Sequence, residues 1–536
     1  MNLFDALARI LLWLAPVLGL LLSSKQLLQF AQLASYQLGG TLRAFLRLPL
    51  KAAWPGAALF AVSTLLLFFA SLVLRLPPFW AFLLSLVFVV LVLAAGYVIG
   101  FIAYQEKRVK VKLVYTLRVK RLLAALFVVS ALMCLLMYRG GLPFGTSALL
   151  PLFAPILLLL AMALIWPLEK AIQLLYRADA KTVLEAYRKT GLTVIGITGS
   201  YGKTTVKNIL YAMLSQVAPT LATPASFNTP LGLARCIREE LGQEHRFFIA
   251  EMGARHPQDI RVLCRMTGPD AGILTSIGPQ HLQTMGSLRQ VAATKYDLIK
   301  ALPKAGFAVF ANDGKLVKEA WGKTEIAKAL VGSPEDDLWA EDVQLTDSGS
   351  TFTLCFQDGS RQAVETSLVG EHNIHNILLA AAMARRYGVP LQKIALALME
   401  VPPIPSRLQM HMHQRGYKVI NNGFNSNPDS SRKALQVLGS HEGRLIVVTP
   451  GFIELGRQEV RSNRRLGNDI AAVAHMAILI GERRTRPIKT GLLESGMLEE
   501  NIKVFPSLMQ ANLFIEDSFG PGDVLLYEND LPDHYA

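Results

Sequence analysis

GITGSYGKTTVKN, residues 196–208, decides the fold expected for the second half of this 536-residue chain. The β-rich run LTVIGITG ends in glycines here, and the helical pattern TTVKNILYAMLSQV follows. A glycine-rich turn between strand and helix exposes backbone N–H groups at a helix N-terminus, which suits an anion. In such a loop Lys203 reaches the outer phosphates of a nucleotide and Thr204 offers a hydroxyl to Mg²⁺. Because Ile197 replaces the first glycine of the strict G-x-x-x-x-G-K-[ST] pattern, only the shorter G-S-Y-G-K-T-T motif remains, Gly199 to Thr205.

Beyond this loop, residues 191–400 repeat the pattern of a buried strand that ends in a turn. FFIAEMG, AGILTSIG and FAVFAND follow it, with helical patterns between them. Strands that alternate with helices predict a P-loop, doubly wound α/β domain with a largely parallel sheet. The alternation in TFTLCFQ (351–357) predicts a hairpin strand at the sheet edge. IHNILLAAAMARRYG (374–388) predicts a helix that stops at a glycine.

A proline-rich segment, EVPPIPSR (400–407), marks the start of another domain over residues 401–536. Helical patterns separate further short β-rich runs in this region: YKVINNG, RLIVVTPG, MAILIGE, IKVFP and GDVLLYE. The alternation predicts a smaller, Rossmann-like α/β domain at the C-terminus.

The first 166 residues have a different composition. A mean hydropathy of +0.35 and a charged fraction of 18% are unusual for a soluble enzyme, and the excess is concentrated in long apolar runs. These runs cover residues 11–22, 56–74, 79–104, 122–138 and 147–166. Most approach the roughly 20 residues that a helix needs to cross hydrocarbon. We therefore expect an α-helical membrane region of about five spans over residues 1–166 and a linking helix over 167–190. The first run could instead be a signal peptide, although the residues before it are not basic and no small-residue cleavage site follows.

The basic residues give the expected orientation. Residues 1–166 hold fourteen Lys and Arg residues and two acidic ones, so most of the chain's net charge of +14 lies there. The loops after the first and third runs carry four and seven of the basic residues, and the other two loops carry one each. Positive loops stay in the cytoplasm, which predicts a multi-pass protein of the cytoplasmic (inner) membrane with its N-terminus outside. The α/β domains after Trp166 would then be cytoplasmic. The basic charge fits this topology and an anionic lipid surface, so we expect a lipid membrane partner and no nucleic-acid partner.

The phosphate loop also resembles that of a known family. G-x-x-G-K-T-T after a β-run is similar to the loop of the Mur ligases, ATP-dependent amide-bond ligases of cell-wall synthesis. Further segments resemble the family in the same order along the chain, over roughly residues 190–536. These segments are SFNTPLG (226–232), EMGARHPQDI, SIGPQHL, ATKYDLI, GEHNIHN, SRLQ and INNGFNSNPDS.

The resemblance implies ATP and two Mg²⁺ ions as cofactors. It assigns Lys203, Lys295 and His281 to catalysis and Thr204, Glu251 and His281 to the metal ions. Lys295 aligns with a lysine that is carbamylated in many members, and an ordinary solvated lysine is the alternative. The implied nucleotide contacts are Gly199, Ser200, Tyr201, Gly202, Lys203, Thr204, Thr205, Asn373, Asn376, Arg407 and Asn422. Helix capping is the alternative role for Asn373, which lies at a predicted helix start.

The implied reaction joins a carboxylate to an amine. The carboxylate attacks the γ-phosphate to give an acyl phosphate, and the amine then attacks the carbonyl and expels phosphate. Phosphoryl transfer depends mainly on charge neutralisation and alignment, for which cationic side chains and oxygen ligands are suited. The implied substrates are an amino acid or dipeptide and a carboxylate-bearing wall precursor.

The chain departs from the family pattern in several places. Asn421 and Asn422 stand where the family usually has two acids, the motif PGFIELG keeps Glu454 but loses an aspartate, and YENDLPD (527–533) replaces a Lys-Gly-Ser-like ending. The apolar region occupies the place of the family's UDP-sugar-binding domain. This exchange motivates the hypothesis of a lipid-linked acceptor.

Three other functions remain open at this point. One is a poly-amino-acid synthetase of the poly-γ-glutamate kind. Another is a transport ATPase, which is disfavoured because the apolar runs lack ionisable residues except at their ends. The last is a non-catalytic scaffold of the Mur type, which the exchange of acids for Asn421 and Asn422 leaves open.

Overall fold

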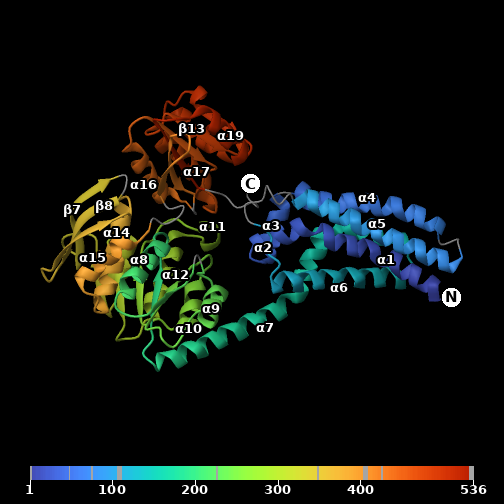
Figure 1. Ribbon diagram of the computed structural model, residues 1–536, viewed down its shortest axis with the longest axis horizontal. Coiled ribbons are helices and arrows are strands. Elements are labelled where there is room, and N and C mark those ends of the chain that lie inside the picture. The colour runs from blue at the N-terminus through green and yellow to red at the C-terminus, as the bar shows by residue number, and fades with distance from the viewer. Residues whose placement is uncertain are drawn as a thin grey trace. The chain divides into compact units, whose positions relative to one another are not determined.

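The computed structural model describes residues 3–47, 49–73, 77–104, 112–224, 227–346, 349–402, 408–423 and 426–529 (Figure 1). The chain divides into two compact units, one ending at Ile172 and the other running from Gln173 to Asp530.

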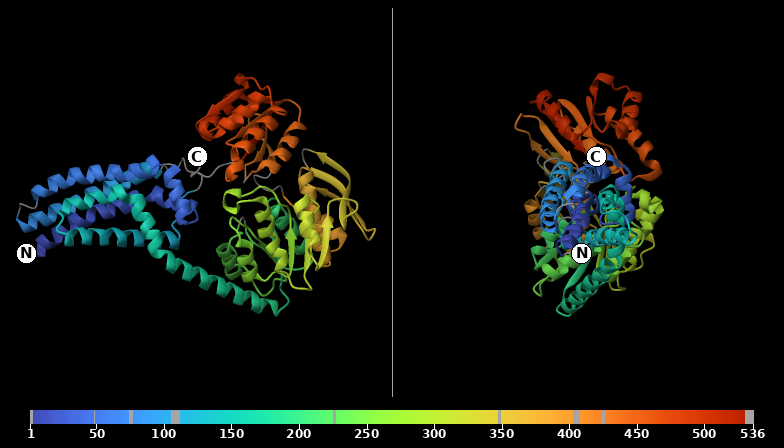
Figure 2. Two further views of the ribbon diagram at one scale, coloured as in Figure 1. Left: turned by 180° about the vertical axis from the view of Figure 1, so that it is seen from behind. Right: turned by 90° about the vertical axis from the view of Figure 1, so that its right-hand side faces the viewer.

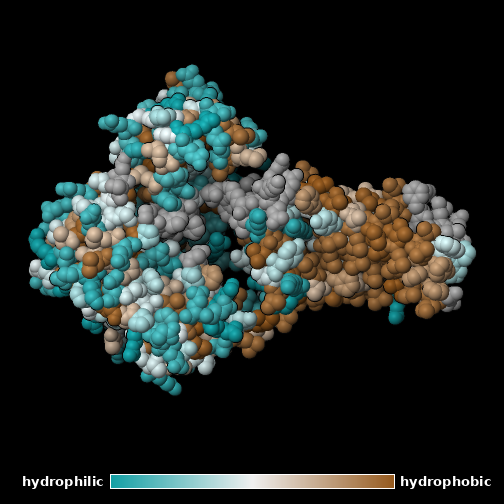
Figure 3. Space-filling view, viewed as in Figure 1, coloured by the Kyte–Doolittle hydropathy of each residue, from teal (hydrophilic) through white to brown (hydrophobic). Residues whose placement is uncertain are grey.

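The first unit is entirely helical in its described residues. Its elements are α1 (Leu3–Ser23), α2 (Lys25–Leu33), α3 (Leu38–Arg47), α4 (Pro49–Val73), α5 (Pro78–Tyr104), α6 (Leu117–Arg139), η2 (Phe144–Phe153) and the first part of α7 (Ala154–Arg188). Four described segments are long and apolar enough to span a bilayer: Leu3–Ser23, Pro78–Tyr104, Leu117–Arg139 and Thr146–Arg188. The predicted run 56–74 lies in α4, where the apolar segment Ala52–Leu66 is shorter. Apolar side chains cover most of the visible face of this unit (Figure 3).

Glycines bring α1 and α5 into close backbone contact. Gly96 and Gly100 lie one turn apart on α5, and a Cβ at either would collide with the carbonyl oxygen of Gly19 or Leu22. Small residues at this spacing let helices approach closely inside a membrane, where packing rather than the hydrophobic effect drives association.

A buried carboxylate joins α6 to α7 in the same unit. Glu169 is 5% exposed and lies 3.2 Å from Arg118 Nε and 2.6 Å from Arg121 Nε. Glu169 follows the predicted end of the last span, and Arg118 and Arg121 precede the predicted start of the fourth span. The two guanidinium groups neutralise a carboxylate that would otherwise be costly to bury.

The second unit begins within α7. Ala180 and Leu184 are buried in the hydrophobic core of the α/β region, and Arg238 Nε forms an ion pair of 2.5 Å with Asp179. The predicted linking helix at 167–190 is therefore part of a longer helix, and its second half belongs to this core.

A nine-stranded sheet forms the centre of this unit, in the order β2-β3-β1-β4-β5-β6-β7-β8-β9. The strands are β1 (Thr193–Thr198), β2 (Thr220–Ala222), β3 (Phe247–Glu251), β4 (Ala271–Leu274), β5 (Phe307–Ala311), β6 (Ala327–Val331), β7 (Leu338–Thr346), β8 (Gly349–Phe356) and β9 (Arg361–Thr366). The strands from β2 to β7 pair in parallel, whereas β7, β8 and β9 pair antiparallel. In Figure 2 the antiparallel strands, in yellow, stand at one side of the sheet.

Helices cover both faces of this sheet, as its doubly wound fold requires. They are α8 (Lys203–Ser215), α9 (Pro230–Glu239), α10 (Asp259–Thr267), α11 (Leu282–Met285), α12 (Leu288–Lys300), α13 (Lys315–Gly322), α14 (Glu371–Arg386) and α15 (Leu391–Glu400). Ile195 and Ile197 of β1 pack in one core with α8 and α14, and Val194 packs in the other with α9, α10 and α12. Because β1 is buried on both faces, it reads as a continuous apolar run.

One detail of the predicted sheet was wrong. TFTLCFQ corresponds to β8, which is a hairpin strand but lies between β7 and β9 rather than at the edge. Phe352, Leu354 and Phe356 are buried on one face of β8, while its other face is partly exposed. The alternation therefore indicates a strand with one buried face, which can lie inside a sheet as well as at its edge.

The C-terminal part contains a separate six-stranded sheet in the order β10-β11-β15-β12-β13-β14. Its strands are β10 (Gln409–Met412), β11 (Lys418–Asn422), β12 (Arg444–Thr449), β13 (Met476–Ile480), β14 (Ile502–Phe505) and β15 (Asp523–Glu528). Its helices are α16 (Pro428–Gly439), η3 (Gly456–Gln458), α17 (Glu459–Ala471), α18 (Glu482–Glu494), η4 (Glu499–Asn501) and α19 (Leu508–Ser518). All strands except the antiparallel β10 were predicted from the sequence.

The close approach of α1 and α5 gives a first prediction. Gly96→Val places two methyl groups against the α1 backbone, and overpacking of this kind typically costs about 1–3 kcal/mol. We expect a lower melting temperature of the purified chain in detergent. Val90→Leu, at an exposed position on the same helix, is the matched control and should leave it unchanged. Equal melting temperatures for Gly96→Val and the wild type would contradict the glycine-mediated contact.

Candidate active site

The phosphate loop follows β1 and leads directly into α8. Gly202, the residue before α8, has a φ of +78°, a left-handed conformation that favours glycine. Lys203 Nζ donates to the carbonyl oxygens of Gly199 (2.8 Å) and Ser200 (3.3 Å). Ser200 is held by the segment after β4, since its N–H donates to the Ser276 carbonyl (2.9 Å) and its hydroxyl donates to the Gly278 carbonyl (3.0 Å). The loop therefore lies at the carboxyl edge of the parallel strands, where α/β folds bind their ligands.

Lys295, on α12, points into the same loop. Its side chain is 2% exposed, and its Nζ donates to the Gly199 carbonyl oxygen at 2.8 Å. Burial, and then the charge of Lys203, hold the pKa of Lys295 well below its ordinary value. The site thus favours a neutral amine at this position, so the solvated lysine considered from the sequence is wrong.

Glu251, expected to bind a metal ion, ends β3 and is buried. Its Oε1 accepts a hydrogen bond of 3.1 Å from Asn228 Nδ2, and its Oε2 lies 3.4 Å from Lys207 Nζ. Lys207 is 2% exposed and also donates to the Thr223 carbonyl at 2.7 Å. Lys207 was not predicted as a site residue, although its place one helical turn after Lys203 puts it on the same side of α8.

The donor set at Glu251 fits a hard cation. Among the described residues Glu251 Oε2 accepts no hydrogen bond, although it lies 3.4 Å from Lys207 Nζ, and carboxylate and hydroxyl oxygens are the ligands that Mg²⁺ prefers. Thr204 supplies a hydroxyl from the first turn of α8. Among the described residues, however, no three His, Cys, Asp or Glu side chains gather as a metal cluster.

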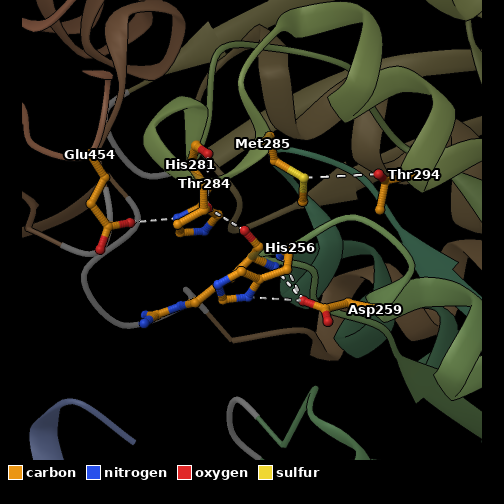
Figure 4. Close-up of polar contacts among 8 residues, drawn as sticks. His256, Asp259, His281, Thr284, Met285, Thr294 and Glu454 are labelled. Carbon is orange, nitrogen blue, oxygen red and sulfur yellow. Dashed lines mark hydrogen bonds and ion pairs between the residues drawn. The ribbon is translucent and has the colours of Figure 1, made fainter. Parts of the chain in front are cut away.

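His281, the other expected metal ligand, interacts with a residue far along the chain. It has a left-handed φ of +52° just before α11, and its Nδ1 lies 2.5 Å from Glu454 Oε2 (Figure 4). Glu454 lies in the loop between β12 and η3 and also has a positive φ, +63°. Burial lowers the pKa of His281, and the hydrogen bond to Glu454 opposes this shift.

Asn373 and Asn376 lie in the first turns of α14, next to the phosphate loop. Asn373 Nδ2 donates to the Val369 carbonyl (2.8 Å), and Asn376 Nδ2 donates to Asn373 Oδ1 (3.3 Å). A Cβ at Gly202 would collide with the Asn376 amide, so this side chain touches the loop. The capping role considered for Asn373 is wrong, because Gly370 is the residue that caps α14.

The remaining predicted nucleotide contacts lie in the C-terminal part. Asn422 is 8% exposed, and its Nδ2 donates to Glu528 Oε2 at 2.8 Å on the neighbouring strand. Glu528 also accepts a hydrogen bond from the Ser426 hydroxyl, and burial raises its pKa to about 7. Asn422, a departure from the family pattern, is therefore a direct partner of Glu528, which belongs to another such departure. Arg407 lies outside the described residues.

The α/β region is similar to known proteins. Residues 197–384 match the Mur ligase middle domain. The chain is 34% identical over 287 residues to the UDP-N-acetylmuramoyl-tripeptide–D-alanyl-D-alanine ligase of Mycobacterium tuberculosis, a match that covers 52% of this chain and 56% of that protein. The crystal structure of MurF from Acinetobacter baumannii is similar with a TM-score of 0.59 at 26% identity, covering 66% of this chain and 77% of that one. MurF ligase from Thermotoga maritima, in complex with ADP, has a TM-score of 0.58 at 22% identity, covering 66% and 80%.

The α/β region of this chain is therefore similar to the Mur ligases, and residues 197–384 match their middle domain. The relatives that it matches include ligases that carry the name UDP-N-acetylmuramoyl-tripeptide–D-alanyl-D-alanine ligase. The chain spans little more than half the length, 56%, of the mycobacterial enzyme that it matches.

The buried Lys295 gives a prediction about stability. In the unfolded chain a lysine keeps its proton up to a pH of about 10.4, whereas the folded protein releases it at a lower pH. At neutral pH the unfolded chain binds a proton at Lys295 more tightly than the folded protein does, which lowers the free energy of unfolding. This loss of stability becomes smaller as the pH rises toward 10. Lys295→Met should raise the melting temperature at pH 7 by at least about 2 °C and by less at pH 9. Lys300→Met, at an exposed position on the same helix, is the control. A Lys295→Met variant that melts below the wild type at pH 7 would contradict the buried-amine assignment.

The Lys207–Glu251 pair gives a separate prediction. Lys207→Met leaves a buried carboxylate without its cation, which typically costs about 3–5 kcal/mol in the free energy of unfolding. Adding Glu251→Gln removes that charge and should restore part of the loss in denaturant titrations. Lys181→Met breaks an exposed i,i+4 pair with Glu185 and should change stability by less than about 0.5 kcal/mol. If the double variant is no more stable than Lys207→Met alone, the two side chains are not coupled.

Proposed function

We propose that this protein is a membrane-anchored, ATP-dependent carboxylate–amine ligase of the Mur type that acts in the synthesis of peptidoglycan precursors. The observation that carries the proposal is the convergence of Lys203 and Lys295 on the Gly199 carbonyl at the end of β1, beside Asn376 and within a Mur ligase middle domain. The reported complex of the Thermotoga maritima relative with ADP supports ATP as the nucleotide.

The first step activates a carboxylate. The α8 N-terminus and Lys203 would bind the β- and γ-phosphates, and the substrate carboxylate oxygen would attack the γ-phosphorus as the bond to ADP breaks. Mg²⁺, when bound through Thr204 and Glu251 and through His281, would supply positive charge that neutralises the phosphates. The products of this step are an acyl phosphate and ADP.

The second step forms the amide. The nitrogen of an amino acid or dipeptide attacks the acyl carbonyl, loses a proton and expels inorganic phosphate through a tetrahedral intermediate. Alignment of the two substrates accounts for most of the rate enhancement in such a transfer. The name of the mycobacterial relative supports D-alanyl-D-alanine as the first amine to test.

Lys295 would act in a modified form. A neutral amine can attack CO₂ to form a carbamate and release a proton, whereas an ammonium cannot. The low pKa of Lys295 supports this modification, because burial favours the reactive neutral form. The resulting carbamate would be an anionic oxygen ligand beside the phosphate loop, in place of a neutral amine.

The apolar helices motivate the membrane part of the proposal. We infer that they anchor the chain in the cytoplasmic membrane with its N-terminus outside and its α/β region in the cytoplasm, as the distribution of basic residues predicts. A ligase held at a bilayer would meet a lipid-linked wall precursor as its carboxylate substrate.

Phosphate release by the purified chain in lipid nanodiscs tests this function. We expect turnover that needs ATP, a carboxylate acceptor and an amine together, with a polyprenyl-linked muramoyl peptide preferred over its UDP-linked form. Lys203→Ala should lower turnover by about 10²-fold or more, as loss of one preorganised charge contact does elsewhere. Lys318→Ala, at an exposed position on α13, is the control.

Other outcomes would contradict parts of this proposal. Turnover that is independent of the amine and coupled to uptake into vesicles would indicate a transport ATPase. No turnover with any substrate pair, from a folded chain, would indicate a scaffold. Equal use of UDP-linked and lipid-linked acceptors would exclude the preference for a lipid-linked substrate.

A further inference from the structure

Glu454 reaches from the loop after β12 to the histidine that precedes α11. Two contacts join these segments: Glu454 Oε2 lies 2.5 Å from His281 Nδ1, and the Glu454 carbonyl accepts a hydrogen bond of 3.1 Å from the Gln283 N–H. In Figure 4 the two side chains point toward each other. The loop is thus held to α11 by its backbone and by its side chain independently.

Both residues adopt a left-handed backbone conformation. The φ values of +52° at His281 and +63° at Glu454 are uncommon for residues with a Cβ, and strain of this kind collects at functional sites. These conformations aim the imidazole and the carboxylate at each other across segments separated by 173 positions in the sequence.

The chemistry of the contact selects one form of the imidazole. An ionised carboxylate only accepts hydrogen bonds, so His281 Nδ1 must carry the proton that it donates to Glu454. In the neutral ring the lone pair is then on Nε2, which is free of this contact. Metal-binding histidines commonly donate their other ring N–H to a carboxylate, which fixes the tautomer and the ring orientation.

The other nearby carboxylate does not compete for the histidine. Asp259 Oδ2 accepts hydrogen bonds of 2.8 Å from the backbone N–H groups of Arg255 and His256, which organise the start of α10. The Thr284 hydroxyl donates to the Arg255 carbonyl and to the His281 carbonyl at 3.1 Å, so it also steadies the backbone around the histidine. Glu454 is the partner that acts on the His281 ring itself.

We propose that Glu454 is a positioning residue for His281, holding its Nδ1–H tautomer and ring orientation so that Nε2 is presented to a divalent cation. Because Glu454 comes from the C-terminal sheet and His281 from the nine-stranded sheet, this metal ligand is complete only when the loop after β12 is docked on α11. The inference rests on the proposed function for the role of the cation, and it adds Glu454, to which the sequence analysis assigned no role.

Cation binding without turnover tests this assignment. Binding of Mn²⁺ to the full chain in nanodiscs, with β,γ-methylene ATP present, can be followed by the electron paramagnetic resonance of free Mn²⁺. Glu454→Ala should weaken binding of one Mn²⁺ by about tenfold or more, the usual effect of removing such a partner. Glu454→Gln should retain most of the affinity, because its amide oxygen still accepts the hydrogen bond from Nδ1.

A double-variant cycle separates positioning from general damage. In a His281→Ala background, Glu454→Ala should cause no further loss, because there is no ring left to orient. Glu494→Gln removes an exposed carboxylate of the same C-terminal part and should bind Mn²⁺ as the wild type does. Deuterium exchange at the Gln283 amide reports docking, and its protection should be unchanged in both Glu454 variants.

The possible failures are distinct. If Glu454→Ala binds Mn²⁺ as tightly as the wild type, the positioning role is excluded. If both Glu454 variants lose protection at Gln283 and lose affinity equally, the contact is only a docking contact and the proposal is also wrong. If the affinities change as expected but the wild type shows no ligase turnover, Glu454 keeps its role and the proposed function fails.

Discussion

The carbonyl oxygen of Gly199 accepts hydrogen bonds from two lysines, and the rest of the site depends on this contact. Lys203 reaches it from the start of α8 and Lys295 from the neighbouring helix α12. Two ammonium groups on one oxygen would repel each other strongly in a buried place, so one of them must lose its proton or be modified. Burial lowers the pKa of Lys295, so this enclosed side chain is the one that favours its neutral form.

The sheet order explains why these side chains meet. Because β1 lies between β3 and β4 in a parallel array, the ends of three strands are adjacent at one edge. Thr198 of β1, Glu251 of β3 and the segment after β4 therefore surround the same loop, although they are up to 80 residues apart. A charged residue at any of these strand ends has an electrostatic effect on the others. Lys207 of α8 is one example, because its ammonium group forms a buried ion pair with Glu251 at the end of β3.

Local patterns in the sequence predicted much of this architecture. The β1 run, the phosphate loop and α8 form one short continuous segment, so their spacing alone indicates a strand, a turn and a helix N-terminus. The family resemblance located Glu251, His281 and Lys295, because each lies in a short motif. Contacts between distant segments were not predictable in the same way. Nothing local to His281 indicates Glu454 as its partner, and nothing local to Asn422 indicates Glu528. The place of β8 inside the sheet was also missed, since an alternating strand can be half-buried without being at an edge.

The buried cluster of Glu169 with Arg118 and Arg121 has a consequence for the helical unit in its proposed membrane setting. Moving a single charged side chain to the centre of a bilayer costs about 2.5–3.5 kcal/mol even on the most permissive scale. The cluster ties α6 and α7 together at one level, immediately beyond the apolar stretch that ends near Trp166. If the unit lies in a bilayer as proposed, a shift of either helix toward the hydrocarbon would carry three charges with it. The ion cluster would thus fix the position of α7 along the bilayer normal and with it the level at which α7 leaves the lipid.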